Sequence, residues 1–395
     1  MKLCELAANL GIETYPTELE AIYENLPAYD GLATSGEQLT MLNEKYDLLG
    51  EYFETVLAGA EEIRNNEDLL TWLRVGYEYC RDASVYEARK FPIPVKDGSV
   101  GRDMFPALLL IREIPDAVKR YEARGFTEAQ IIKNLGNIKI NLWVHKITVG
   151  TVSLSQGLYN WLTLYTKALI VDHKGFNYQP NVWGATTVVL KNTNTSEYAI
   201  VMTTGTFNKD GLIVGSCGLS DEEGSFNADF LETTDMIFGH RSKGGKAQPT
   251  LEKFPKSEWK VVLRPGEDVV GLHIPRNTNL DPAYVAESFR EGFELVKKLY
   301  PEISPKFLTC NSWLMETKLV DILGPDAKLS KFTTKFQKYP LKDTAGAGCL
   351  GYVWPGEKCE VSQYSEKTTL QRGIKKLMLE GDFIRTTGGI ITDEL

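Results

Sequence analysis

Residues 257–323 constrain the fold most, because a strand, a polar loop, a long helix and a second strand follow one another there. Val269–Ile274 is apolar and β-branched, as β-strands prefer. Asp281 is a typical N-cap, and Pro282–Tyr300 then places apolar residues at helical spacing. Phe307–Cys310 is a short apolar strand. This order predicts a right-handed crossover that joins two parallel, neighbouring strands.

A ligand site is expected where these two strands end. In open α/β sheets, ligands bind beyond the carboxyl ends of parallel strands. The polar loop Arg276–Leu280 follows the first strand, and Cys310–Ser312 ends the second. Both segments should therefore lie at the same edge of the sheet.

The residues that flank the crossover also carry local signals. Arg264–Asp268 contains a Pro-Gly pair that suits a tight turn, so Val261–Leu263 and Val269–Ile274 are predicted to form a hairpin. Leu314–Leu323 is predicted to be a second helix, which stops at a Gly-Pro pair.

The rest of the chain falls into two parts with different composition and hydrophobic pattern, which predicts an α+β protein. Residues 1–148 are rich in Leu, Glu, Ala and Lys and predict a helical N-terminal domain. Residues 149–395 predict a mixed, mostly antiparallel domain with one β-α-β crossover. The predicted helices are Glu37–Ala60, Glu67–Tyr86, Pro115–Ala123, Glu128–Gly136, Leu154–Ile170 and Thr368–Glu380. The further predicted strands are Thr186–Lys191, Tyr198–Thr203, Leu212–Gly215, Lys335–Pro340 and Gly348–Trp354, and residues 241–249 are predicted to be a basic flexible loop.

Composition excludes several classes of function. A chain of 395 residues is too long for one ordinary core, which favours two domains. Its net charge of −9 argues against binding to nucleic acid or to an anionic membrane. Six cysteines without a CxxC pair indicate neither a zinc framework nor a disulfide scaffold. With no signal-peptide pattern at the start, we expect a cytoplasmic protein without a bound metal, and its oligomeric state stays open.

Several stretches resemble the GNAT superfamily of N-acyltransferases. More closely, the chain is similar to a bacterial two-domain group in which a helical N-terminal domain precedes a GNAT-like C-terminal domain. The resemblance covers most of residues 105–395. The stretches that carry it are Gly157–Trp161, Ala168–Gln179, FGH at 238–240, SEW at 257–259, RPGEDVV at 264–270, LHIP at 272–275, DPAYVAESFREG at 281–292, CNSWL at 310–314, TTLQRGI at 368–374 and RTTGGII at 385–391.

The resemblance implies that acyl-CoA is a co-substrate, held where the two parallel strands splay apart. Backbone groups of the first strand would polarise the thioester carbonyl, and the diphosphate would lie at the start of the next helix. A base would deprotonate the acceptor, and an acid would protonate the leaving thiolate. The implied contacts are Val270, Leu272, Ile274, Arg276, Asn277, Thr278, Asn279 and Asn311.

The diphosphate loop departs from the pattern of the superfamily, which usually reads (Q/R)xxGx(G/A). Here the loop is RNTNLDP and contains no glycine, so side chains crowd the backbone. Asp281 also places a carboxylate where the diphosphate would lie. Three alternatives follow: CoA binds in another way, another thioester carrier is used, or the fold serves another purpose.

The candidate catalytic residues each have a structural alternative. His273 ends the first parallel strand and is a candidate general base; alternatively it is a strand histidine bonded to backbone. His240 could reach the same cleft or cap a turn. Ser312, like Asn311, could contact substrate or cap the next helix. Cys310 is either a nucleophile or a small buried apolar residue.

These observations favour an acyltransferase that moves an acyl group from a thioester to an amine or hydroxyl of a small-molecule acceptor. The alternative is a non-enzymatic GNAT-like scaffold that binds a ligand or a protein. A third class is a hydrolase that uses Cys310 or Ser312 with a histidine.

Overall fold

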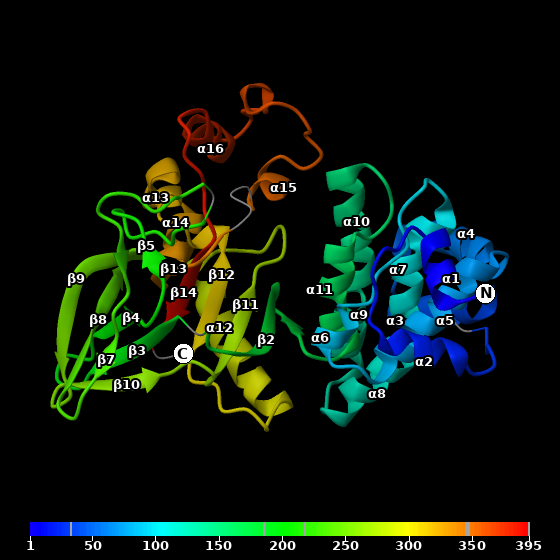
Figure 1. Ribbon diagram of the computed structural model, residues 1–395, viewed down its shortest axis with the longest axis horizontal. Helices are drawn as coiled ribbons and strands as arrows, with labels where there is room; N and C mark the ends of the chain where they lie inside the picture. Colours follow the sequence, from blue (N-terminus) through cyan, green and yellow to red (C-terminus); the bar gives the residue numbers. More distant parts are fainter. Residues whose placement is uncertain (32–33, 185, 217, 344–347, 394–395) are drawn as a thin grey trace. The chain divides into compact units, whose positions relative to one another are not determined.

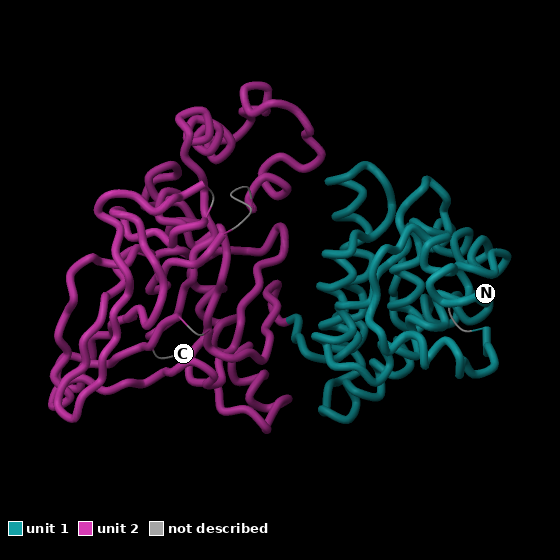
Figure 2. Tube along the Cα trace, viewed as in Figure 1, with its two compact units in different colours: residues 1–172 teal, residues 173–395 magenta. Residues whose placement is uncertain are grey.

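The computed structural model describes residues 1–31, 34–184, 186–216, 218–343 and 348–393, so Cys217 lies outside the described residues. The chain forms two compact units, residues 1–172 and 173–395 (Figure 2). Helix α11 (Gln156–Thr166) packs on α7 (Val100–Arg112) within the first unit. The predicted domain boundary after residue 148 stays a prediction, but the two compact units separate later, at Asp172.

The first unit is entirely helical apart from its last residues, within the described part of the chain. Its centre is α7, in which residues 104–111 are all buried and Gly59 lets α4 approach Met104 closely. The remaining elements are α1 (Leu3–Asn9), α2 (Glu18–Glu24), α3 (Gly36–Tyr46), η1 (Gly50–Tyr52), α4 (Phe53–Arg64), α5 (Glu67–Asp82), α6 (Val85–Ala88), α8 (Ile114–Ala123), α9 (Glu128–Leu135) and α10 (Asn137–Val149) (Figure 1).

One helical prediction fails and one helix was not predicted, both for local reasons. The predicted helix Glu37–Ala60 is two helices, because Asp47 takes a left-handed conformation with φ 50° and ends α3. Helix α7 was not predicted, because its buried residues lie on every face and leave no amphipathic period. The predictions at Pro115–Ala123 and Glu128–Gly136 are confirmed by α8 and α9.

The second unit contains the predicted crossover in a six-stranded sheet of order β1-β2-β11-β12-β14-β13. Strands β11 and β12 are parallel, and the helix between them is α12 (Pro282–Leu299), so this prediction is confirmed. The described ladders on either side are antiparallel. The strands are β1 (Val171–His173), β2 (Phe176–Val182), β11 (Asp268–His273), β12 (Leu308–Ser312), β13 (Gln337–Pro340) and β14 (Thr387–Ile391).

A second sheet of order β10-β3-β4-β8-β7, with β9 paired to β8, packs against the first. Trp183, Val189, Ile200, Tyr339 and Ile390 share one buried cluster between the two sheets. The α+β class is therefore confirmed, although the antiparallel strands form two sheets. The strands are β3 (Thr187–Asn192), β4 (Tyr198–Met202), β7 (Leu231–Glu232), β8 (Met236–Lys243), β9 (Lys246–Pro255) and β10 (Trp259–Leu263), and β5 (Thr206–Phe207) pairs with β6 (Phe226–Asn227).

The predicted hairpin between β10 and β11 is wrong, although its turn is present. The Glu267 N–H donates to the Arg264 carbonyl at 3.1 Å, and Gly266 has φ 85°. However, β10 pairs with β3, whereas β11 pairs with β2 and β12. The turn therefore carries the chain from one sheet to the other.

Three other local predictions are also wrong. Residues 241–249 form the tip of the β8–β9 hairpin, because Gly244 and Gly245 both have positive φ, as a tight two-residue turn requires. Leu212–Gly215 makes only an isolated bridge at Ile213. Gly348–Trp354 contains the helix α15 (Leu350–Val353) and no strand.

Helices cover the ends and one face of the first sheet. On α12, the absence of a side chain at Gly292 makes room for the ring of Tyr178 from β2. Between β13 and β14 the chain leaves the sheet as α15, η3 (Val361–Gln363) and α16 (Thr369–Leu379), which Figure 1 shows in orange and red beyond the ends of β11 and β12. The predicted helix Leu314–Leu323 is instead η2 (Trp313–Met315) and α13 (Lys318–Leu323), followed by α14 (Lys328–Thr333).

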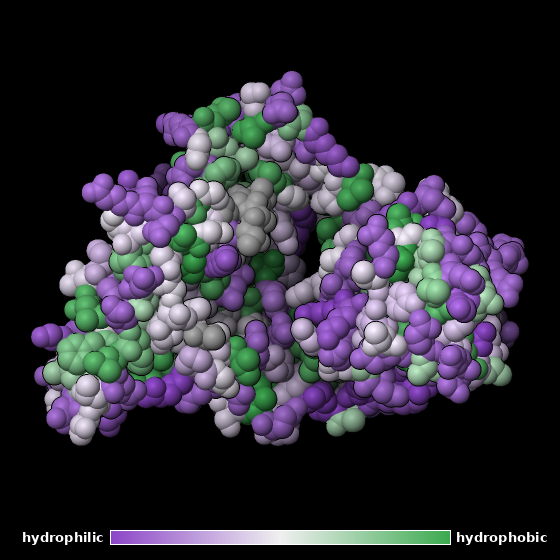
Figure 3. All heavy atoms as spheres, in the orientation of Figure 1, coloured by the Kyte–Doolittle hydropathy of each residue, from purple (hydrophilic) through white to green (hydrophobic). Residues whose placement is uncertain are grey.

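The visible surface of the first unit is largely hydrophilic (Figure 3). Within the described residues, no helix combines the length and apolar character needed to cross a bilayer.

Candidate active site

The parallel strands β11 and β12 separate before either one ends. Their ladder consists of Val270 opposite Leu308 and Gly271 opposite Thr309. Beyond this point β11 continues along β2 to His273, while β12 continues along β14 to Ser312. A gap therefore opens between two strands that are each held in place from the other side.

The backbone of β11 turns one edge toward this gap. The Val270 N–H donates to the Phe307 carbonyl at 2.9 Å, so Val270 faces β12. Alternate residues of a strand present their N–H and C=O groups to the same neighbour, so Leu272 faces the gap too. The Gly271–Thr309 pair of a parallel ladder uses the Leu272 N–H, which donates to the Thr309 carbonyl. Of the predicted contacts, the carbonyl of Leu272 and the backbone of Ile274 therefore lie beyond the ladder, whereas the N–H groups of Val270 and Leu272 are already used.

His273 lies at the mouth of the gap and contacts Gln179 of β2. Its Nε2 is 2.9 Å from the Oε1 of Gln179, and both side chains are partly buried. An amide oxygen only accepts, so Nε2 carries the hydrogen in this contact. The neutral tautomer then has its basic lone pair on Nδ1. Gln179 was not predicted as a site residue, since its link to His273 is a cross-strand pairing that sequence alone does not reveal.

Tyr352 links the residues that follow the two strands. The Cζ of Arg276, which follows β11, lies 5.2 Å from the Tyr352 ring centroid. Trp313, which follows β12, lies 6.1 Å from the same ring. Arg276 also donates to the carbonyls of Tyr352 and Gly351 at 2.9 and 2.8 Å. Tyr352 was not predicted as a site residue, because this stretch was predicted to be a strand.

One donor of Arg276 is unused. Its Nε is buried and has no hydrogen-bond partner within the described part of the chain. A hydrogen bond from a ligand acceptor to a buried donor of this kind would stabilise the complex, because it removes the cost of leaving the donor without a partner. Tyr352 itself is 52% exposed, so a ligand can reach its ring.

The predicted diphosphate loop uses its polar groups internally. Thr278 Oγ1 lies 2.8 and 2.7 Å from the carbonyl oxygens of Gly175 and Pro275, which share its single hydrogen, and Asn279 Oδ1 accepts from the Asp281 N–H at 3.0 Å. Asn277 is exposed and has φ 66°.

The start of α12 is also capped. Asp281 Oδ1 accepts from the Ala283 N–H at 3.2 Å, and Pro282 has no N–H to offer. An anion at this helix start would meet a carboxylate and few free donors. The contacts that the resemblance implies for Asn277, Thr278 and Asn279 therefore gain no support from this arrangement.

The end of β12 is positioned by β13 and β14. Asn311 Oδ1 accepts from the Tyr339 hydroxyl at 2.9 Å, and the side chain of Asn311 is exposed. Burial raises the pKa of Tyr339 well above its usual value, so this phenol stays protonated. Ser312 Oγ accepts from the Leu314 N–H at 3.1 Å, the geometry of a cap.

His240 lies elsewhere in the second unit. It belongs to β8, and its Nδ1 is 2.9 Å from the Gln248 carbonyl of β9, while its ring packs on Phe226. Strand β8 adjoins β13, since Ser242 Oγ donates to the Lys338 carbonyl at 2.8 Å. Because β13 is three strands from β11, it lies roughly 14 Å from that strand. His240 and His273 are therefore not brought together across the sheet.

The Cys310 thiol is poorly suited to act as a nucleophile. It is 2% exposed, and burial raises its pKa to about 12. The thiol therefore stays protonated at neutral pH. No group of three or more His, Cys, Asp and Glu side chains suitable for a metal ion is present among the described residues.

Two family models match the chain. The model described as the GNAT-like C-terminal domain matches residues 192–391, just over half of the chain. The chain belongs to this family. The N-acyltransferase N-terminal domain matches residues 37–168, so the two-domain resemblance is confirmed. No curated protein matches the chain.

Solved structures of acyltransferases share the fold of this family member. A complex with decanoyl-CoA and teicoplanin has a TM-score of 0.69 at 13% identity and covers 99% of both chains. A complex with decanoyl-CoA has a TM-score of 0.67 at 14% identity and covers 100% of both chains. A mutant enzyme bound to octanoyl-CoA has a TM-score of 0.68 at 12% identity and covers 99% of both chains.

Proposed function

We propose that this protein transfers an acyl group from acyl-CoA to an amine or hydroxyl group of a small-molecule acceptor. The observation that carries the proposal is the gap between β11 and β12, which opens after Gly271 and Thr309 while both strands continue. An extended thioester arm lying in this gap would find the carbonyl of Leu272 and the backbone of Ile274 beside it. Membership of the N-acyltransferase family supports the same chemistry.

In the proposed reaction, the acceptor attacks the thioester carbon while His273 takes its proton through Nδ1. The bond between carbon and sulfur breaks, and the thiolate leaves with a proton from an acid. Gln179 holds Nε2–H and so keeps Nδ1 as the basic atom. Tyr352 brings a phenol to the mouth of the gap and is our candidate for the acid.

The acyl chain is proposed to be of medium length. Solved structures with this fold contain octanoyl-CoA and decanoyl-CoA. One also contains teicoplanin, which supports a polar small-molecule acceptor without identifying it. Because the start of α12 is capped, we place the diphosphate elsewhere, with Arg276 Nε as one donor available for the ligand.

A specific observation favours a second candidate, a GNAT-like scaffold without catalytic activity. Asp281 and Pro282 leave few of the free N–H groups that normally receive the diphosphate of CoA. A scaffold would keep the fold without binding CoA. The hydrolase alternative is weaker, because Cys310 is buried and protonated.

Calorimetry with CoA, acetyl-CoA, octanoyl-CoA and decanoyl-CoA tests the proposal. We expect decanoyl-CoA to bind and to raise the melting temperature, since binding to the folded state stabilises it by mass action. Acetyl-CoA should bind more weakly, because it buries less apolar surface. If no acyl-CoA binds at millimolar concentration, the acyltransferase proposal fails and the scaffold alternative gains support.

A further inference from the structure

A pocket of about 390 Å³ lies beside β13, away from the gap between β11 and β12. Its lining includes Ser242 and Lys243 near the β8–β9 turn, Thr317, Thr334 and Phe336, and Lys338 of β13. This volume lies within the range of small-molecule sites.

Lys338 is a buried lysine of this pocket. The residue is 7% exposed, and its amine makes no hydrogen bond or ion pair with any residue that the structure describes. Two other buried lysines differ. Lys167 pairs with Glu113 at 3.0 Å and donates to a backbone carbonyl, while Lys375 pairs with Glu366 at 2.7 Å. Among the described residues, a carboxylate forms an ion pair with each of those two lysines but none forms one with Lys338.

Glu316 is an opposing charge that acts on Lys338, but no ion pair joins them among the described residues, and both of its oxygens already accept hydrogen bonds. Its Oε1 accepts from Thr317 Oγ1 at 3.3 Å, and its Oε2 accepts from the Arg385 N–H at 3.4 Å. Burial lowers the pKa of Lys338, and Glu316 offsets this only in part. The amine is therefore left in a poorly solvated position, and none of its three donors is used by a described residue.

The other polar groups of the pocket complement this amine. The hydroxyls of Ser242 and Thr334 donate their hydrogens to the carbonyls of Lys338 and Ser330, at 2.8 and 3.0 Å. Their oxygens remain available as acceptors. Lys243 adds a second ammonium and pairs with Glu252 at 3.3 Å. The pocket thus offers positive charge, acceptor oxygens and an apolar wall at Phe336.

We propose that this pocket binds a small organic anion, either a carboxylate or a phosphate ester, whose oxygens accept from the amine of Lys338. Lysine binds such oxyanions as a compact point charge. The hydroxyl groups of the ligand would donate to Ser242 and Thr334. The site is separate from the proposed acyl-transfer site, because β12 and β14 lie between β11 and β13.

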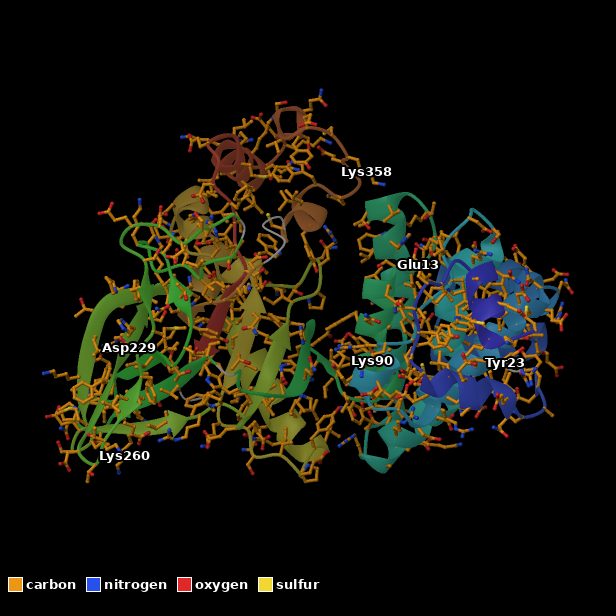
Figure 4. All side chains as sticks on the ribbon, viewed as in Figure 1. Glu13, Tyr23, Lys90, Asp229, Lys260 and Lys358 are labelled. Atoms are coloured by element: carbon orange, nitrogen blue, oxygen red, sulfur yellow. The ribbon has the colours of Figure 1, made fainter. Side chains whose placement is uncertain are left out.

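Calorimetry at fixed ionic strength, with acetate and inorganic phosphate as probes, tests this site. The variants are Lys338→Met and the control Lys260→Met, which removes an exposed lysine of β10, labelled in Figure 4. We expect at least one probe to bind the wild type and the control equally, and Lys338→Met at least tenfold more weakly. Preference for phosphate identifies a phosphate ester, and preference for acetate identifies a carboxylate. Equal binding to Lys338→Met and the wild type, or no binding to the wild type, overturns the proposal.

A second measurement covers the case in which Lys338→Met does not fold. Lysines of the wild type are dimethylated with ¹³C, and the resonance missing from Lys338→Arg is assigned to Lys338. This resonance should shift as the bound probe saturates. A resonance that stays unmoved at saturating probe rejects the site.

Discussion

His273 Nε2 lies 2.9 Å from Gln179 Oε1, and this contact orients the histidine ring at the mouth of the β11–β12 gap. If His273 is the base, His273→Ala should lower turnover by about 10²–10⁴-fold with the fold intact, as for loss of a general base. Gln179→Ala should cost less, about tenfold, because the ring is retained but no longer oriented. The rate of thiol release from decanoyl-CoA with an accepted amine measures both effects.

His240→Gln is the matched control for His273→Ala. His240 is buried and bonded to the Gln248 carbonyl, so its loss should lower stability by about 1 kcal/mol. The folded variant should keep the turnover of the wild type. If His240→Gln loses turnover at unchanged stability while His273→Ala does not, the assignment of the base is reversed.

Gly388 is the subject of a stability prediction. It lies opposite Tyr339 in the β13–β14 ladder, and a Cβ at this position would overlap the tyrosine ring. Gly388→Ala should therefore destabilise the second unit by about 1–3 kcal/mol, the usual cost of overpacking. Gly184→Ala serves as the control, because a Cβ there meets open space. Urea denaturation measures the unfolding free energy of both variants. If the two variants are equally stable, the sheet accommodates the added methyl group at Gly388 without cost.

The local signals of the sequence were enough to predict the crossover, and the structure shows why. Asp281 caps α12 as expected, and Val270 and Leu308 pair in parallel because the connecting helix leaves no alternative direction. The Pro265-Gly266 turn was also found. The hairpin inferred from this turn is wrong, because β11 pairs with β2, which lies about ninety residues earlier in the sequence.

The site was only partly predictable, because some of its residues come from segments that are distant in the sequence. His273 and Arg276 stood out because they adjoin a predicted strand end. Gln179 and Tyr352 reach them from distant segments, so their role depends on sheet order and on the excursion between β13 and β14. The capped start of α12 was indicated by Asp281 and Pro282, but only the hydrogen bond to Ala283 shows that the donor is used.

Asp382 should make the free energy of unfolding depend on pH in the acidic range. Burial would raise its pKa, but hydrogen bonds from Lys318, from the Phe383 N–H and from Arg385 outweigh burial and lower the pKa to about 2. A lowered pKa stabilises the folded state above the unfolded pKa of about 3.9, and this contribution is lost as pH falls toward 2.

Asp382→Asn measures this contribution. The carboxylate is partly exposed, so the loss at pH 7 should be only ~1 kcal/mol. The difference in unfolding free energy between variant and wild type should shrink between pH 5 and pH 2. A difference that stays constant over this range would assign the effect to packing rather than to charge.

Arg276 connects the fold to acyl-CoA recognition. It ties the end of β11 to Tyr352, and its buried Nε has no partner within the described residues. If a ligand oxygen accepts from Nε, Arg276→Ala should weaken decanoyl-CoA binding by about tenfold, the cost of one charge-assisted hydrogen bond. Arg290→Ala, which removes an exposed arginine of α12, should leave the affinity unchanged. Calorimetry with decanoyl-CoA on both variants tests this prediction. If Arg276→Ala binds decanoyl-CoA as tightly as the wild type does, the acyl-CoA lies away from the strand end that Arg276 occupies.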